Sequence, residues 1–193
     1  MVKIGFVVED DAMRLVIESM SFTHIIESLG IESVGVFSAD GRDWFRHKNE
    51  KINSFMMIFQ QSGADYIYFL MDLEDDSCIT LSKKKIYKYS DNQVSIVVVK
   101  AIESWFLADS QTLSSIFNQE YYYSNPELMD ATPFDTLREE FIRLTGRGIG
   151  KRRNLHTKMM ISNGFSVVNA ASHTDCRSAK YFINSLKENR NKV

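Results

Sequence analysis

The sequence KIGFVVEDD at residues 3–11 is an apolar run that ends in three acids. A second stretch, YIYFLMDLEDD at residues 66–76, has the same form. Buried strands of parallel sheets read as continuous apolar runs, so both stretches predict interior strands. Ligands of open α/β sheets bind beyond the carboxyl ends of the strands. We therefore expect the two acidic clusters to meet at one edge of a sheet and to form the functional site there.

The rest of the N-terminal half continues this pattern of strand and helix. Two further strand-like runs lie at 33–38 and 94–99, and apolar stripes at helical spacing cover 12–29, 42–63 and 102–117, with a basic amphipathic segment at 82–89. Such alternation is typical of a mostly parallel sheet with helices on both faces. The sequence thus predicts an α/β fold around a four-stranded sheet.

The C-terminal third has no strand-like run. Helical patterns cover 134–144, 156–163 and 179–189, and a basic loop with spaced glycines, GRGIGKRR at 146–153, separates the first two. We expect two regions: an α/β core at 1–118 and a helical C-terminal extension at 119–193 that packs on it.

Composition narrows the class of protein. Hydrophobic residues make up 44% and charged residues 25% of the 193-residue chain, as in soluble globular domains. No apolar run approaches the roughly 20 residues of a membrane helix, and the N-terminus lacks a signal-peptide pattern. Cys78 and Cys176 have no zinc-type spacing, and two lone thiols are typical of a reducing compartment. We expect a cytoplasmic protein without membrane contact.

Charge is distributed unevenly along the chain. Residues 1–76 hold 14 acidic and 6 basic residues, whereas residues 77–193 hold 11 acidic and 17 basic ones. This asymmetry fits an acidic metal site followed by a basic surface for a polyanion. It also fits a merely uneven distribution of surface charge.

The acids at the strand ends are the first candidate site. Glu9 could bind a metal ion or act as a general base. Asp72, Glu74 and Asp76 alternate, so they would project from one face if the strand continued. Mg²⁺, or Mn²⁺ in its place, prefers such oxygen ligands and substrate phosphates. The alternatives are a helix cap for the acids after the first strand and a solvated acidic loop for those after the third.

Other charged residues supplement this site. Asp11 and Glu103 are possible additional metal ligands, and Glu103 could equally pair with a nearby Lys or Arg. Glycine-freed amides and basic side chains can hold phosphate groups, which makes the basic loop and the helix after it a candidate nucleic-acid or phosphate site; the alternative is a charged surface turn. Its candidate residues are Arg147, Lys151, Arg152, Arg153 and His156.

The chain lacks the sequence motifs of several reaction classes. The chain has neither G-x-x-x-x-G-K-[ST] nor a G-x-G-x-x-G after a strand, and no Ser/His/Asp or Cys/His arrangement stands out. The sequence therefore argues against P-loop nucleotide hydrolysis and hydride transfer.

Four segments resemble the Toprim domain, and in particular a small uncharacterised Toprim-like family. They are residues 8–10, 72–78, 100–109 (KAIESWFLAD, the most specific) and a tail from Lys158 through 176–179 to Phe182. Toprim domains occur in topoisomerases, primases and nucleases of the overcoming-lysogenization-defect type. The resemblance implies a Toprim/Rossmann-like fold over nearly the whole chain.

The resemblance also implies residue roles. In Toprim domains a glutamate and a D-x-D pair bind Mg²⁺ and act on phosphodiesters; Glu9 would be that glutamate, and Asp72 with Glu74 the pair. The related nucleases also use a lysine, for which Lys158 is the candidate. The chain departs from the family pattern at Asp10, where many members have glycine, at Met13, a position often acidic in the nucleases, and at Glu74, which replaces an aspartate.

The function implied is a Mg²⁺-dependent nuclease acting on DNA or RNA. Family members are often encoded beside ATPase genes in bacterial defence loci, so the resemblance implies an effector of anti-phage defence with an ATPase partner of the AAA or ABC type, and it allows a homo-oligomer. The alternative is a catalytically incomplete regulatory or binding subunit of an ATPase complex. A receiver-like phosphotransfer domain is a third reading, which the long C-terminal extension disfavours.

Overall fold

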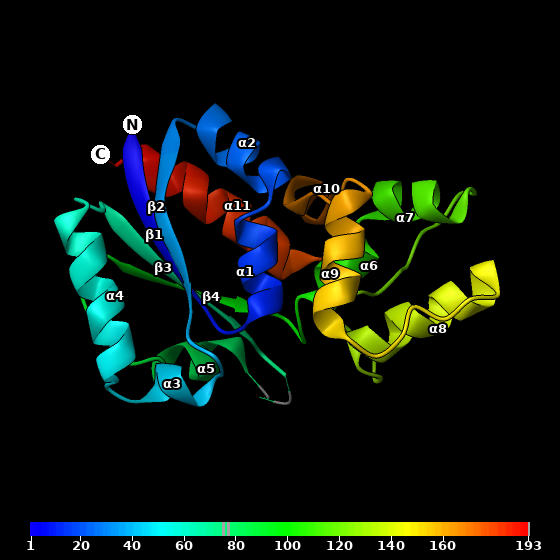
Figure 1. The fold of residues 1–193 in the computed structure, drawn as a ribbon, viewed down its shortest axis with the longest axis horizontal. Helices are drawn as coiled ribbons and strands as arrows, with labels where there is room; N and C mark the ends of the chain where they lie inside the picture. The colour runs from blue at the N-terminus through cyan, green and yellow to red at the C-terminus, as the bar shows by residue number, and fades with distance from the viewer. Residues whose placement is uncertain (75, 77, 193) are drawn as a thin grey trace.

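A parallel sheet of four strands forms the centre of the molecule (Figure 1). The computed structural model describes residues 1–74, 76 and 78–192. The strand order is β2-β1-β3-β4, and every neighbouring pair is parallel. The strands are β1 (Val2–Val8), β2 (Ile31–Ser38), β3 (Tyr66–Asp72) and β4 (Gln93–Val98). The α/β fold with a four-stranded parallel sheet, expected from the sequence, is confirmed.

Helices cover both faces of this sheet (Figure 1). The helices of the described residues are α1 (Asp11–Ile17), α2 (Met20–Ser28), α3 (Asp43–Arg46), α4 (Glu50–Gln61), α5 (Ile79–Lys85), α6 (Glu103–Ala108), α7 (Ser110–Phe117), α8 (Pro133–Thr145), α9 (Arg153–Ser162), α10 (Val167–Ser172) and α11 (Arg177–Arg190). Alternate side chains of β3 enter two separate hydrophobic clusters: Phe69 packs with residues of α3 and α4, and Tyr68 with residues of α1, α2 and α11. Both faces are therefore buried, which explains why the strands are apolar throughout.

The register aligns the carboxyl ends of the central strands. Val8 pairs with Leu70, and the Glu9 N–H donates to the Leu70 carbonyl at 2.9 Å. On the other side of β3, the Leu73 N–H donates to the Val98 carbonyl at 2.7 Å. The segments that leave β1, β3 and β4 therefore start side by side at one edge of the sheet.

Two of the long helices expected from the sequence are interrupted by capping residues. The helix expected at 12–29 breaks at Ser19, whose hydroxyl accepts the Phe22 N–H, and the helix expected at 102–117 breaks at Asp109, whose carboxylate accepts the Thr112 N–H. A side-chain oxygen that accepts a backbone N–H starts a new helix at that point. The helix expected at 42–63 is likewise split into α3 and α4.

The C-terminal helices pack on the sheet layer. Phe182 of α11 stacks on Phe22 of α2 and on Trp105 of α6, with ring centroids 5.6 and 5.7 Å apart. The Trp105 indole N–H donates to the Ser178 hydroxyl at 2.8 Å. Further along, α9 packs against α1, which brings the basic loop before α9 to the edge of the sheet. Among the residues described, no helix is long and apolar enough to cross a membrane.

Gly5 lets α4 lie directly on the sheet. A Cβ atom at this position would lie 2.4 Å from the Phe59 ring, and Phe59 itself is fully buried. The parallel register with β2 also shifts between Ile4 and Gly5. The absence of a side chain at residue 5 is thus a packing requirement.

We expect Gly5→Ala to lower the free energy of unfolding by about 1–3 kcal/mol, because a methyl group forced into a filled core displaces its neighbours. Chemical denaturation measures this change. Gly148→Ala is the matched control: its Cβ would make only ordinary contacts with Ile142, at 3.7 Å, so the change should stay within about 0.5 kcal/mol. Equal denaturation midpoints for Gly5→Ala and wild type would contradict the packing described.

Candidate functional site

Glu9 and Asp72 meet at the shared edge of β1 and β3. Glu9 follows the last residue of β1, and Asp72 is the last residue of β3. The Asp72 backbone N–H donates to Glu9 Oε2 at 2.9 Å. Both residues are buried, with 7% and 3% of their surface exposed. The structure therefore brings together the two acids that the sequence placed 63 positions apart.

Burial makes the ionised forms of these acids unfavourable. It raises the pKa of Glu9 to about 7, with help from the carboxylates of Glu74 and Asp10 and against the hydrogen bond from the Asp72 N–H. Burial also holds the pKa of Asp72 well above its usual range, and the nearby Glu103 and Glu9 act in the same direction. Such a pair binds either a proton or a cation.

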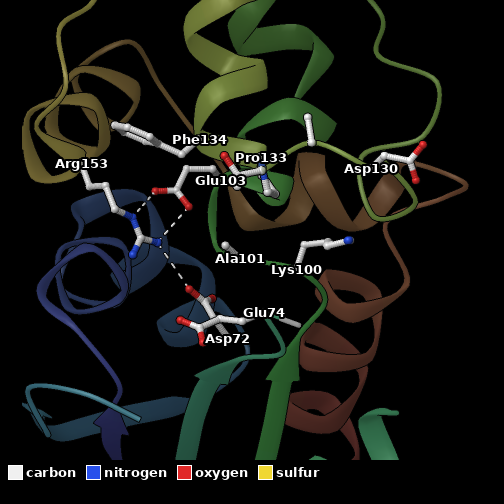
Figure 2. A pocket seen from close by; sticks show the side chains of 11 residues that line it. Asp72, Glu74, Lys100, Ala101, Glu103, Asp130, Pro133, Phe134 and Arg153 are labelled. Atoms are coloured by element: carbon white, nitrogen blue, oxygen red, sulfur yellow. Dashed lines mark hydrogen bonds and ion pairs between the residues drawn. The ribbon is translucent and has the colours of Figure 1, made fainter. Parts of the chain in front are cut away.

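Arg153, the first residue of α9, supplies positive charge at this place (Figure 2). Its Nε and Nη2 donate to the two carboxylate oxygens of Glu103 at 2.7 and 2.9 Å. Nη1 donates to Asp10 at 3.1 Å, and Nη2 also lies 3.3 Å from Asp72 Oδ2. Of the two roles considered for Glu103, the structure shows the ion pair. Arg153, expected to contact phosphate, contacts the acids instead.

The oxygen atoms at this edge form a small donor set for a divalent cation. Asp72 Oδ1 is buried and has no hydrogen-bond partner among the residues that the structure describes, although buried carboxylate oxygens are normally paired. Within the described part of the chain, no group of three or more His, Cys, Asp or Glu residues could hold a metal ion. Mg²⁺, however, is usually held by one or two carboxylates together with water and substrate phosphates. Glu9 and Asp72 fit that smaller set.

The expected strand alternation through Asp72, Glu74 and Asp76 is wrong, because the strand ends at Asp72. Glu74 nevertheless lines the same cavity as Asp72. Glu74 has a φ of +48°, a left-handed conformation that ends the alternation. Its carboxylate lies 3.1 Å from Arg42. Asp76 accepts hydrogen bonds from Ser82 at 2.6 Å and Lys85 at 2.9 Å, so its carboxylate is held against α5. Asp75 and Ser77, part of the resembling segment, lie outside the described residues.

The acids after Glu9 have separate roles. Asp10 caps α1, since its Oδ1 accepts the Met13 N–H at 2.9 Å, and its other oxygen binds Arg153. Asp11, expected as an additional ligand, pairs with Arg14 at 3.1 Å. The helix-cap alternative is therefore correct for Asp10.

His156 holds the basic loop in place. Its ring is buried, stacks on Phe134 with centroids 4.8 Å apart, and places Nε2 2.6 Å from the Ile149 carbonyl. Burial lowers the pKa of His156, which favours the neutral ring. A buried ring bonded to backbone anchors the loop, whereas the expected phosphate contact would need an exposed one.

The remaining basic candidates are exposed. Arg147, Lys151 and Arg152 lie on the surface of the loop between α8 and α9. Lys158 is also exposed; five residues beyond Arg153, it is rotated from it by about 140° around the helix axis. Among these basic candidates, Arg153 contacts Asp10, Asp72 and Glu103, and it lies at the start of the helix on which the resemblance placed the lysine.

A cavity of about 420 Å³ opens beside the acids. Figure 2 shows Arg153 and Glu103 on one side and Lys100 and Asp130 on the other. The lining residues are Asp72, Glu74, Lys100, Ala101, Glu103, Asp130, Ala131, Thr132, Pro133, Phe134 and Arg153. The volume lies within the range of small-molecule sites.

Sequence reasoning did not select Lys100 or residues 130–134 as site residues. Lys100 has a φ of +63°, and its carbonyl accepts the Glu74 N–H at 2.8 Å, which joins the loops after β3 and β4. Lys100 could have been selected from the sequence, because it lies directly after a strand that ends at the acidic edge. Residues 130–134 reach the cavity only through the packing of α8 on α6.

Comparisons of this chain with protein-family models, with curated proteins and with solved structures return no match.

Proposed function

We propose that this protein is a Mg²⁺- or Mn²⁺-dependent nuclease of Toprim type, which hydrolyses phosphodiester bonds in DNA or RNA. One observation carries the proposal: Glu9 and Asp72 are buried against each other, and Asp72 Oδ1, beside an open cavity, has no hydrogen-bond partner within the described part of the chain. Buried, unpaired carboxylates are unfavourable unless a cation or proton compensates them. A hard divalent cation with a phosphate as its further ligand meets that requirement.

Each residue of the site would have its own role in the reaction. Glu9 and Asp72 would hold the ion, which when bound activates a water and offsets charge on the phosphate. Arg153 presents guanidinium N–H groups beside the acids and keeps 38% of its side chain exposed, so it can stabilise charge on a phosphate oxygen. Lys100 lines the cavity too and adds a second positive charge.

The exposed basic loop supports a nucleic-acid substrate. Arg147, Lys151 and Arg152 lie in the segment that leads directly into Arg153, so a strand crossing the cavity would pass over them. Lysine and arginine contacts to phosphates supply most of the sequence-independent affinity for nucleic acid. An ATPase partner and an effector role in anti-phage defence are part of the proposal through the resemblance alone.

A nuclease assay of the full chain tests this proposal. Single- and double-stranded DNA and RNA are incubated with wild type and with Glu9→Gln, in Mg²⁺, in Mn²⁺ and in EDTA. We expect cleavage by wild type only with the divalent cation, and little or none by Glu9→Gln. Equal cleavage by both proteins would show that Glu9 has no role in catalysis, and cleavage in EDTA would show that the reaction needs no metal ion.

The second candidate function is a regulatory or nucleic-acid-binding subunit without catalysis. The contacts of Arg153 favour it, because an arginine already forms ion pairs with Asp10, Asp72 and Glu103. Crystals soaked in Mn²⁺ separate the two functions by anomalous scattering. An ion between Glu9 and Asp72 supports the nuclease, whereas an unchanged Arg153 pair with no ion supports the binding subunit.

A further inference from the structure

Arg153 is held unequally by its three acidic partners. Glu103 receives a two-pronged contact, at 2.7 and 2.9 Å, and its side chain is 1% exposed. The Nη2 atom that donates to Glu103 is shared with Asp72, at the longer distance of 3.3 Å. Two-pronged arginine–carboxylate pairs are the stronger and more specific kind. Glu103 is thus the anchor of Arg153, and Asp72 is its weakest partner.

Asp72 has a free position for another ligand. Its Oδ1 atom is buried and has no hydrogen-bond partner in residues 1–74, 76 and 78–192, whereas Oδ2 contacts Arg153. Asp72 also lines the cavity, so a small cation held in the cavity would lie next to this side chain. A divalent cation brought next to Arg153 would be repelled by the guanidinium, since like charges at about 4 Å interact by several kcal/mol at the effective dielectric of a protein surface.

We propose that Arg153 and a divalent cation compete for Asp72. When the ion binds, the contact between Arg153 Nη2 and Asp72 breaks, whereas the hydrogen bond from Arg153 Nε to Glu103 remains. The Nη2 N–H released from Asp72 can then donate to a phosphate oxygen in the cavity, while the other N–H of Nη2 stays on Glu103. This inference rests on the proposed function and adds regulation to it. Without the ion, Arg153 neutralises the acids; with the ion, the same arginine becomes part of the phosphate site.

The wild-type chain tests the exchange directly by NMR. The Nη2–Hη signal of Arg153 is assigned by its absence in Arg153→Lys and is followed during a Mg²⁺ titration. We expect the signal to move with a midpoint equal to the Mg²⁺ dissociation constant measured by calorimetry. Binding of Mg²⁺ without movement of this signal would overturn the exchange and leave the metal-dependent function standing. Absence of Mg²⁺ binding would overturn both.

Metal affinity gives a second readout that needs no substrate. Removal of a competing positive charge should tighten binding, so the Mn²⁺ dissociation constant of Arg153→Gln, measured by electron paramagnetic resonance, should fall about tenfold. Arg143→Gln removes the same charge from an exposed pair with Glu140 on α8 and should leave the constant unchanged. A weaker Mn²⁺ affinity in Arg153→Gln than in Arg143→Gln would overturn the proposal, because Arg153 would then support the ion.

Discussion

Asp72→Asn is expected to reduce nuclease activity by roughly 100- to 1000-fold, the usual effect of removing one group that stabilises charge in a reaction. The replacement keeps the shape of the side chain and removes the negative charge that would hold the ion. Since burial already disfavours the ionised form of Asp72 and raises its pKa, the neutral amide should not unfold the chain. We expect the denaturation midpoint in EDTA to stay equal or to rise. Turnover and Mn²⁺ binding, measured on the same preparation, separate a lost site from a lost fold.

Asp76→Asn is the matched control for this experiment. It makes the same chemical change four residues later, at a carboxylate engaged by Ser82 and Lys85. We expect its activity to stay within about twofold of wild type, because changes away from such a site have small effects. A loss as large as that of Asp72→Asn would favour the alternating carboxylates of the sequence prediction and would contradict the placement of Asp76.

The meeting of Glu9 and Asp72 was predictable, because it depends only on two parallel strands that end together. Apolar runs identified both strands, and the rule that ligands bind at the carboxyl edge gave the location. The position of Asp76 was not predictable in this way. It depends on one backbone angle, the positive φ of Glu74, which most non-glycine residues avoid.

Arg153 illustrates a different limit of sequence reasoning. The sequence identified Arg153 as one of several candidate phosphate-binding residues in the glycine-rich basic loop, and nothing in the sequence distinguished it from the others. What distinguishes it is the packing of α9 against α1, which places Arg153 beside Asp10, a residue 143 positions earlier. No local pattern encodes that contact.

The broken helices have a similar origin. Apolar spacing continues across Asp109, so the sequence predicts one helix where the structure has α6 and α7. Asp109 is fully buried and accepts N–H groups from Thr112 and from the distant Ser166. The tertiary contact fixes the carboxylate as a cap, and the cap ends the first helix.

Stability in EDTA should fall as the pH rises from 4.5 to 7. The pKa of Glu9 is about 7 in the folded chain against 4.5 as its ordinary value. Between these values the folded state keeps a proton that the unfolded state has released, so a rise in pH favours unfolding. This difference corresponds to about 3 kcal/mol at most, and the slope ends above pH 7. The raised pKa of Asp72 acts in the same direction. Urea denaturation at several pH values between 4.5 and 8 measures the effect.

Glu9→Gln isolates the contribution of Glu9 from that of other titrating groups. Burial lowers the pKa of His156, so this residue acts in the opposite direction: over part of the range the unfolded chain binds a proton there and the folded chain does not. Because His156 is present in both proteins, its contribution cancels in the comparison. The stability of Glu9→Gln should therefore fall less than that of wild type over this pH range. Saturating Mg²⁺ should restore wild-type stability near pH 7 by binding only the folded state, and should do so much less for Glu9→Gln. Equal slopes in EDTA would mean that Glu9 titrates as a solvated acid, and the buried contact with Asp72 would then be incorrect.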